Sequence, residues 1–336
     1  MIRRRRNTIS RRLAMLQLAS AGAVLSAPAC SRLVGRTPRL RDDPFTLGVA
    51  SGYPRPDSVV LWTRLLPRSD EPRGGWPAHV VPVEWEVAAD EGFREIIRRG
   101  RAVAKADLAY SVHVEPVGLK PGRPYWYRFI AGGVRSPSGR TATAPSADVL
   151  PPRLRVAVAS CQHYEQGLYV AYRHLVADAP DLVVHVGDYI YETGSAECYW
   201  TDSWNGYPAA RQRLLDVLRQ GVANPVVLSG DIHAFVVAEL DAVAGDRGSG
   251  ILASEFVTTS ISSRGLPQTM VDAWLKENSN VRLARPDLRG YLRLDLEPGS
   301  LRTDLIAMNS VSDPAAGCRV LASYVVESGR AGPMCA

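Results

Sequence analysis

Short apolar runs alternate with polar residues along the middle of the chain. Two of these runs, residues 156–159 and 182–186, are rich in β-branched side chains and have the length of buried strands. Between them, apolar residues recur at helical spacing, at Leu168, Ala171, Tyr172 and Leu175. Because parallel strands are joined by a crossover of about a dozen residues or more, usually a helix, this stretch predicts a strand–helix–strand unit with parallel strands.

Residues able to bind a metal ion follow the apolar runs. They are Cys161 after the first run, Asp188 and Tyr191 after the second, and Asp231 and His233 after a third run at residues 226–228. Ligands of open α/β sheets bind outside the carboxyl ends of the strands. We therefore expect the three strand ends to meet at one edge of a single sheet and to form a metal site.

The preceding part of the chain has the pattern of short strands separated by Gly/Pro turns. Strands are predicted at residues 58–64, 83–87, 110–114 and 124–129. This organisation favours a β-sandwich. The Leu-x-Pro-Gly-x-x-Tyr-x-Tyr stretch from Leu119 to Tyr127 looks like the corner of a fibronectin type III or immunoglobulin-like domain, where a Tyr hydroxyl bonds back to the chain. We interpret three tryptophans as part of its core, with carbohydrate stacking as the alternative: Trp62, Trp85 and Trp126.

The pattern after residue 192 continues the second domain. A helix is predicted over residues 208–219, with Leu214, Leu215 and Leu218 on one face. Further strands are predicted at residues 235–240, 255–259, 290–296 and 301–308. A chain of 336 residues is long enough for about two domains, which we place at residues 42–148 and 153–325.

The basic charge of the chain comes mainly from its first residues. The sequence has 40 basic and 34 acidic residues, but six arginines lie within residues 1–29, so the remainder is balanced. This balance argues against a nucleic-acid partner. Residues 1–29 have a basic start, the pair Arg11-Arg12 and an apolar run, which predicts a twin-arginine signal peptide. An ordinary secretory signal or a membrane anchor is the alternative, and we expect no transmembrane span in the mature chain.

The cysteines leave two questions open. Cys30 directly follows the expected cleavage site, where lipidation is an alternative to simple processing. Cys318 and Cys335 are candidates for a disulfide after export to an oxidising compartment.

Other polar residues are assigned non-ligand roles. We interpret His163, His174 and His185 as structural, because His185 lies in a predicted strand and His174 in a predicted helix. Arg211 and Arg213 are interpreted as a solvated helix face, with phosphate binding as the alternative.

Seven motifs together resemble the alkaline phosphatase D family, the PhoD-like metallophosphatases. They are the Arg11-Arg12 leader, Phe45–Gly52, Val59–Arg64, Ala159-Ser-Cys161-Gln162, Gly187-Asp188-Tyr-Ile-Tyr191-Glu192, Asp202-Ser-Trp-Asn-Gly-Tyr207 and Gly230-Asp231-Ile-His233. The resemblance implies an immunoglobulin- or fibronectin-III-like sandwich followed by an α/β metallophosphoesterase domain, an αββα sandwich. It also implies export by the twin-arginine machinery and a periplasmic, extracellular or cell-wall location.

The resemblance further implies hydrolysis of small phosphomonoester or phosphodiester substrates by a metal-activated water. The family's cofactors are iron as Fe3+ and calcium. Carried over to this chain, Cys161 would be a thiolate ligand of iron, Tyr191 a phenolate ligand and Asp188 the carboxylate that bridges the metals. Asp231 and His233 would lie at the metal site. Thiolate and phenolate suit Fe3+, whereas carboxylates suit calcium.

The chain departs from the family between its Tyr191-Glu192 and Asp202-Ser-Trp motifs. Family members carry a longer segment there with an Asp-Asp-His-Glu motif, whereas only residues 193–201 join the two motifs here. The phosphoesterase domain is therefore expected to be shortened, with either a gap in its sheet or an exposed sheet edge. Two functions follow: an exported phosphoester hydrolase, or a catalytically impaired relative acting as a secreted binding or scaffold protein.

Overall fold

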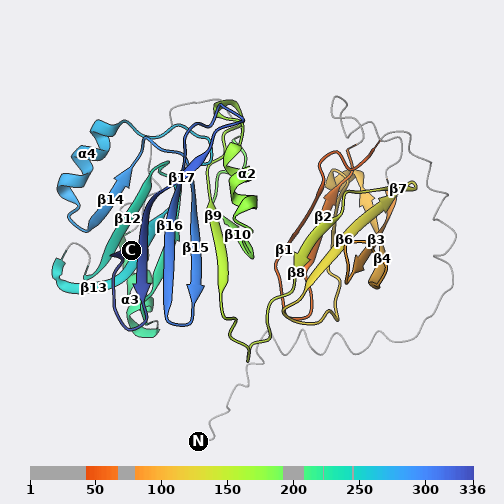
Figure 1. Ribbon diagram of the computed structural model, residues 1–336, viewed down its shortest axis with the longest axis horizontal. Helices are drawn as coiled ribbons and strands as arrows, with labels where there is room; N and C mark the ends of the chain where they lie inside the picture. The colour runs from red at the N-terminus through yellow and green to blue at the C-terminus, as the bar shows by residue number, and fades with distance from the viewer. Residues whose placement is uncertain (1–42, 67–79, 192–207, 222, 244–245) are drawn as a thin grey trace, which may run out of the picture. The chain divides into compact units, whose positions relative to one another are not determined.

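The computed structural model describes residues 43–66, 80–191, 208–221, 223–243 and 246–336 (Figure 1). The predicted signal peptide, Cys30, Glu192 and the motif at residues 202–207 lie outside these ranges. The chain divides into two compact units between Ser146 and Ala147.

The N-terminal unit is a sandwich of two antiparallel sheets. One sheet has the order β1 (Val49–Gly52), β2 (Val60–Arg64) and β5 (Ser111–Val114). The other has the order β4 (Ile96–Lys105), β3 (Val80–Ala88), β6 (Pro124–Ala131) and β7 (Val134–Arg135), with β8 (Gly139–Ala142) also paired to β6. The predicted sandwich and its four strands are therefore confirmed, and β1, β4, β7 and β8 are additional strands.

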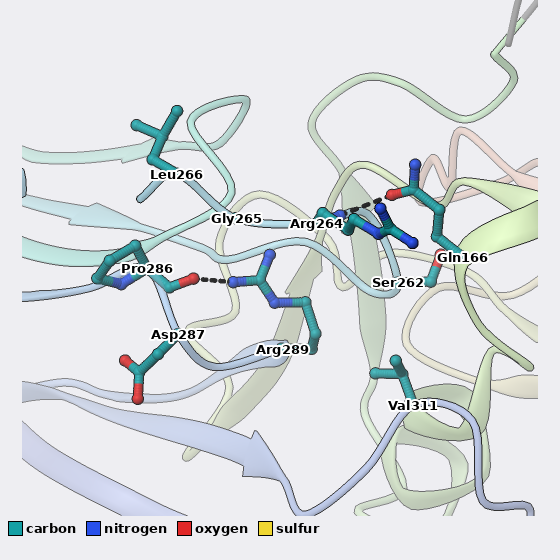
Figure 2. Close-up of a pocket in the computed structure, with 9 residues that line it drawn as sticks. All are labelled: Gln166, Ser262, Arg264, Gly265, Leu266, Pro286, Asp287, Arg289 and Val311. Carbon is teal, nitrogen blue, oxygen red and sulfur yellow. Dashed lines mark hydrogen bonds between the residues drawn. The ribbon is translucent and has the colours of Figure 1, made fainter. Parts of the chain in front are cut away.

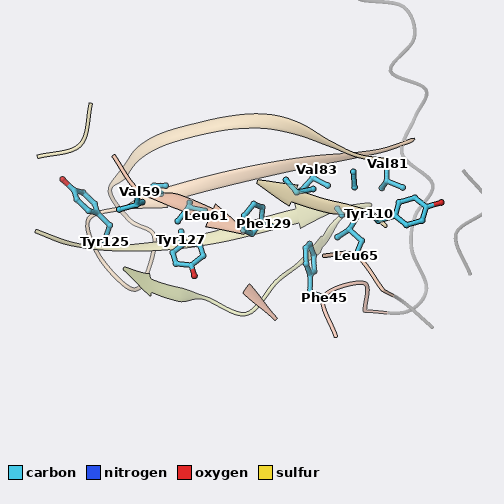
Figure 3. Close-up of a cluster of buried hydrophobic side chains, with 14 of the residues drawn as sticks. Phe45, Val59, Leu61, Leu65, Val81, Val83, Tyr110, Tyr125, Tyr127 and Phe129 are labelled. Atoms are coloured by element: carbon cyan, nitrogen blue, oxygen red, sulfur yellow. The ribbon is translucent and has the colours of Figure 1, made fainter. Parts of the chain in front are cut away.

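Alternation along β6 decides which aromatic residues fill the sandwich core. Tyr125, Tyr127 and Phe129 are buried between the sheets (Figure 3). Trp126 projects from the opposite face, because successive side chains of a strand point to opposite sides. Trp85 is partly buried and packs against the core, whereas Trp62 is half-buried outside it. The prediction that the three tryptophans belong to the core is therefore confirmed in part for Trp85 and wrong for Trp62 and Trp126.

The predicted tyrosine corner is present at the start of β6. The Tyr125 hydroxyl accepts a hydrogen bond from the Lys120 amide over 2.8 Å and lies 3.4 Å from the Lys120 carbonyl oxygen. The Tyr125 ring is buried in the core. The bond therefore ties the loop before β6 to the sandwich.

The C-terminal unit contains two sheets that enclose a common core. The first sheet has the order β10 (Leu182–His185), β9 (Leu154–Ala159), β15 (Gly290–Glu297), β16 (Ser300–Met308), β17 (Cys318–Glu327) and β18 (Met334–Cys335). The second has the order β11 (Val226–Ser229), β13 (Asp246–Val257), β12 (Phe235–Val243) and β14 (Val281–Arg285). Val158 and Leu292 of the first sheet pack with Phe235 and Phe256 of the second.

Within the described ranges, three α-helices accompany the two packed sheets of the C-terminal unit. Helix α2 (Val170–Ala177) packs through Ala171 and Leu175 on the outer face of the first sheet. Helix α3 (Pro208–Gly221) contacts β13, and α4 (Gln268–Glu277) contacts β14 (Figure 1).

The predicted strand–helix–strand unit is β9, α2 and β10. The two strands are parallel, with Val158 opposite Val184. Strand β10 forms the edge of its sheet within the described ranges, and Leu182 and Val183 are 38% and 47% exposed. The expected exposed edge is therefore present.

One prediction about the sheet was wrong. Strand β11 pairs with β13 and belongs to the second sheet, so the strand ends that carry the candidate ligands do not share one sheet. An apolar run specifies burial, but it does not specify which backbone the strand pairs with, because every backbone offers the same hydrogen-bonding groups. The ligands instead follow strands of two facing sheets.

The proposed pairing of Cys318 with Cys335 is also wrong. Cys318 lies opposite Met308, whereas Cys335 lies opposite Tyr324, six residues farther along β17. At about 3.4 Å per residue this separates them by about 20 Å, far beyond the reach of a disulfide. Both thiols are free.

Candidate metal centre

The candidate ligands stand on strained backbone just after three strands. Cys161 follows β9, Asp188 follows β10, and Asp231 and His233 follow β11. All four have positive φ angles, of 56°, 49°, 75° and 53° respectively. Residues other than glycine rarely adopt this conformation, which costs on the order of 1–3 kcal/mol each and is concentrated at functional sites.

Hydrogen bonds between the loops hold the first two turns in place. The Cys161 amide donates to the Gly187 carbonyl, and the Gln162 amide donates to the Asp188 carbonyl, each over 3.1 Å. Because both bonds join the ends of neighbouring parallel strands, they fix Cys161 next to Asp188. The strand–helix–strand pattern thus positions the first half of the site.

Three of the predicted ligands form one cluster. One donor atom each from Cys161, Asp188 and His233 lies within 4.8 Å of the others. Cys161 is buried, His233 is half-buried and Asp188 is exposed. The cluster is therefore closed on the thiol side and accessible on the carboxylate side.

Tyr191 joins this cluster, whereas the Asp231 side chain does not. The Tyr191 hydroxyl lies 3.1 Å from His233 Nε2. Asp231 is exposed, and its contact with the cluster is its backbone carbonyl, 3.9 Å from Cys161 Sγ. The structure thus brings four of the five predicted residues together by their side chains.

The hydrogen bonds of His233 fix its tautomer. Its Nδ1 lies 2.5 Å from the Arg264 carbonyl oxygen, which can only accept, so Nδ1 carries the proton. Nε2 then presents its lone pair to the cluster and accepts from the Tyr191 hydroxyl. A histidine that donates one ring N–H to a backbone carbonyl is oriented to ligate a metal with its other nitrogen.

Burial determines which side chains of the cluster carry a proton when no cation is bound. It raises the pKa of the Cys161 thiol and of the Tyr191 phenol, and it lowers the pKa of the His233 imidazole. Thiol and phenol therefore hold their protons at neutral pH, and the imidazole is neutral. A bound cation would displace the thiol and phenol protons, so metal binding here is coupled to proton release.

Ser263 and Arg264 belong to the site although the sequence patterns did not single them out. Ser263 Oγ lies 3.0 Å from the Tyr191 hydroxyl and 2.8 Å from the Cys161 carbonyl oxygen. Both residues lie at the end of a segment rich in Ser and Thr that follows β13, residues 258–264, in which Thr258, Thr259 and Ser260 are fully buried. Buried Ser/Thr residues in a loop are a recognisable signal, since they need hydrogen-bond partners.

The histidines assigned structural roles have different surroundings. His174 Nε2 lies 2.9 Å from the Ala316 carbonyl oxygen, and the His185 ring packs against Tyr189. The His163 ring centroid lies 4.8 Å from that of Tyr191, and its buried Nε2 has no hydrogen-bond partner. His163 therefore packs directly against the cluster. The positive charge of Arg211 in α3 lowers the pKa of the Glu255 carboxyl group and offsets part of the rise that burial causes.

Comparisons with known proteins cover both units. The sequence model of the N-terminal domain of PhoD-like phosphatases matches residues 29–145. The model of the PhoD-like phosphatase domain matches residues 156–199 and 194–305. Together these matches span most of the chain.

The relatives of the chain include a curated protein and a solved structure that cover different shares of it. Alkaline phosphatase D of Bacillus subtilis (strain 168) is 50% identical over 180 residues, which cover 53% of this chain and 30% of that protein. The chain thus matches less than a third of the length of that relative. A solved structure of PhoD superposes with a TM-score of 0.80 at 28% identity, covering 87% of this chain and 92% of that one.

Proposed function

The chain belongs to the PhoD-like phosphatase family, and from this premise we propose that it is an exported hydrolase of phosphomonoesters or phosphodiesters that uses iron and calcium. The family consists of metal-dependent phosphoester hydrolases. The observation that carries the proposal for this chain is the Cys161, Asp188 and His233 cluster, with donor atoms within 4.8 Å of one another.

The donor set fits an Fe3+ ion. Thiolate and phenolate oxygen from Cys161 and Tyr191, together with the imidazole of His233, are ligands typical of iron or another transition metal. The fit is supported by the tautomer of His233, whose Nε2 lone pair faces the cluster because Nδ1 donates to Arg264. Calcium takes oxygen ligands, so we assign it to the exposed carboxylate of Asp188.

When bound, such ions supply a hydroxide nucleophile from water and stabilise the negative charge of the phosphoryl oxygens. The protein's own residues orient the site. Arg264 holds His233 through its carbonyl, and Ser263 holds Tyr191 through its hydroxyl. The exposed side of the cluster, at Asp188, is where a phosphoester would enter.

Export would follow the twin-arginine route, through the signal proposed for residues 1–29. This route carries folded proteins, which suits a chain whose ligands come together only after folding. In the part of the chain that the structure describes, no helix has the length and apolar character needed to cross a membrane.

The test combines metal content with turnover on the same sample. We expect the purified exported protein to contain iron and to hydrolyse bis(para-nitrophenyl) phosphate when calcium is added. Asp188→Ala is expected to abolish turnover, whereas Asp148→Ala, at an exposed position in the linker after the sandwich, serves as the matched control. A folded, metal-loaded protein without turnover would refute the hydrolase proposal.

A second candidate function is that of a secreted binding or scaffold protein. It is favoured by the short connection of residues 193–201, where the family carries its Asp-Asp-His-Glu segment. Within the described ranges, Cys161, Asp188 and His233 form the single His/Cys/Asp/Glu cluster compact enough to hold a cation. A cooperative unfolding transition with neither bound iron nor turnover would support this function.

A further inference from the structure

A pocket of about 420 Å³, whose lining side chains are drawn in Figure 2, shares Arg264 with the surroundings of the candidate metal centre. Arg264 and Leu266 line it from the loop after β13, and Pro286 and Arg289 line it from the loop between β14 and β15. Gln166 contributes a third side, next to the loop that follows Cys161. The side chains of these residues are not ligands of the metal cluster, and Arg264 contacts the cluster only through its backbone carbonyl.

The pocket and the cluster share a wall made of one segment. The Arg264 carbonyl accepts from His233 Nδ1 over 2.5 Å, and its amide donates to Gln166 Oε1 over 2.7 Å. Ser263, the preceding residue, contacts the Tyr191 hydroxyl. Ser263 and Arg264 thus separate the cluster from the pocket. A molecule that reacts at the cluster can therefore place a second group in the pocket by extending past this one segment.

Arg289 gives the pocket a fixed positive charge. Its Nη1 donates to Ser260 Oγ and the Ser263 carbonyl, and its Nη2 donates to the Pro286 carbonyl. Burial lowers the pKa of Arg289 to about 10, so the group remains charged at neutral pH. One Nη2–H and the Nε–H of Arg289 have no acceptor among the residues that the structure describes.

The acidic residue of the pocket is already neutralised. Asp287 receives two hydrogen bonds of 2.8 Å from Arg285 Nε and Nη2. This ion pair lowers the pKa of Asp287. The Asp287 carboxylate is thus paired with Arg285, and its charge also acts on Arg289.

Arg264 and Gln166 add further donors. The Arg264 guanidinium is exposed and has no hydrogen-bond or ion-pair partner within the described ranges. Gln166 uses its oxygen to accept from the Arg264 amide, which leaves its NH₂ group for another partner. Leu266 and Val311 supply apolar surface at the same pocket.

We propose that this pocket is a subsite for an anionic group, a carboxylate or phosphate, carried on the organic part of the phosphoester, and that Arg264 selects it. The proposal rests on the phosphoester hydrolase function proposed above. A guanidinium fork matches the oxygens of either anion, and the apolar surface accommodates the carbon spacer that joins the anion to the reacting phosphoryl group. Phosphoesters with a second negative charge are therefore the preferred substrate class.

The test compares two phosphodiesters whose three-methylene chains end either in a methyl group or in a carboxylate. Para-nitrophenyl butyl phosphate and para-nitrophenyl carboxypropyl phosphate release the same chromophore, and a phosphopropyl analogue separates phosphate from carboxylate recognition. The native chain is expected to have the higher kcat/KM for the charged substrates. Arg264→Gln is expected to lower this preference about tenfold, the effect of losing one charge-assisted hydrogen bond.

Two further variants sharpen the result. Arg264→Lys keeps the charge without the planar fork and is expected to retain part of the preference. Arg330→Gln removes an exposed arginine after β17, at the opposite end of the first sheet, and is expected to retain all of it. An unchanged preference in Arg264→Gln, or an equal loss in Arg330→Gln, would overturn the subsite.

A binding measurement separates this proposal from the hydrolase function. If the native chain hydrolyses neither diester, the hydrolase proposal fails, and calorimetry with glutarate and its neutral diamide still tests the subsite. Glutarate binding that is lost in Arg264→Gln supports the subsite. Equal binding of the diamide, or glutarate binding that is unaffected by Arg264→Gln, refutes it.

Discussion

His233 donates its Nδ1–H to the Arg264 carbonyl oxygen over 2.5 Å and thereby turns its Nε2 lone pair toward Tyr191. This bond connects the loop after β11 with the loop after β13. It orients the imidazole before any cation binds. Pre-orientation by a backbone carbonyl is typical of metal-ligating histidines.

Replacement of His233 by alanine is expected to lower the affinity for the transition metal by at least about 100-fold, since it removes a proposed ligand. Metal content after dialysis against a weak chelator is the measurement. His113→Ala, at an exposed position of β5, is the control. Full metal content in His233→Ala would exclude the imidazole as a ligand.

Ser263→Ala is expected to weaken metal binding by about 10- to 100-fold while the chain still folds. The substitution removes the hydroxyl that contacts both Tyr191 and the Cys161 carbonyl, so the phenol loses its orientation. The phenolate-to-Fe3+ absorption band should shift as well. Ser328→Ala, at an exposed position after β17, should leave affinity and spectrum unchanged, and an equal effect there would contradict the role of Ser263.

Gly230→Ala is expected to destabilise the fold by about 1–3 kcal/mol. A Cβ at this position would lie 2.8 Å from both Ser160 Oγ and Val186 Cγ2, closer than packed side chains approach. The loop that carries His233 would have to shift, which should also weaken metal binding. At Gly299 a Cβ meets no atom within 4 Å, so Gly299→Ala is the matched control in urea unfolding.

Glu255→Gln is expected to stabilise the protein at high pH. Burial raises the pKa of Glu255 above its ordinary value of 4.5, and the hydrogen bond from Ser229 and the charge of Arg211 offset this only in part. Because the pKa of Glu255 is higher in the folded state than in the unfolded state, the free energy of unfolding falls as pH rises from the unfolded-state pKa to the folded-state pKa. The variant has no such loss, so its advantage over the native chain should be absent near pH 4 and present near pH 8.

Urea unfolding at the two pH values measures this difference. Glu297→Gln, at an exposed position of β15, is the control and should show no pH-dependent gain. An advantage of Glu255→Gln that is equal at both pH values would show that its cause is packing rather than ionisation.

Tyr125→Phe is expected to destabilise the N-terminal sandwich by about 1–2 kcal/mol. The hydroxyl is the acceptor for the Lys120 amide over 2.8 Å, and its removal leaves that amide without this partner. Thermal unfolding of this variant is compared with that of Tyr164→Phe, whose ring is 82% exposed. Equal stability of the two variants would mean that the corner bond contributes nothing.

Local patterns in the sequence determined much of the fold. The spacing from residue 156 to residue 186 predicted β9, α2 and β10, because a parallel crossover is a contiguous unit. The position of Cys161 beside Asp188 followed from it. The tyrosine corner was equally local, since Tyr125 bonds to a residue only five positions earlier.

Only the tertiary structure decided how distant segments meet. It assigned β11 to the second sheet, separated Cys318 from Cys335, and brought Ser263 and Arg264 to Tyr191 and His233. Strand pairing uses backbone groups that all residues share, so an apolar run does not encode its partner. The sequence by itself thus determined which residues can bind a metal. The packing of two sheets against each other decided which of these residues share a site.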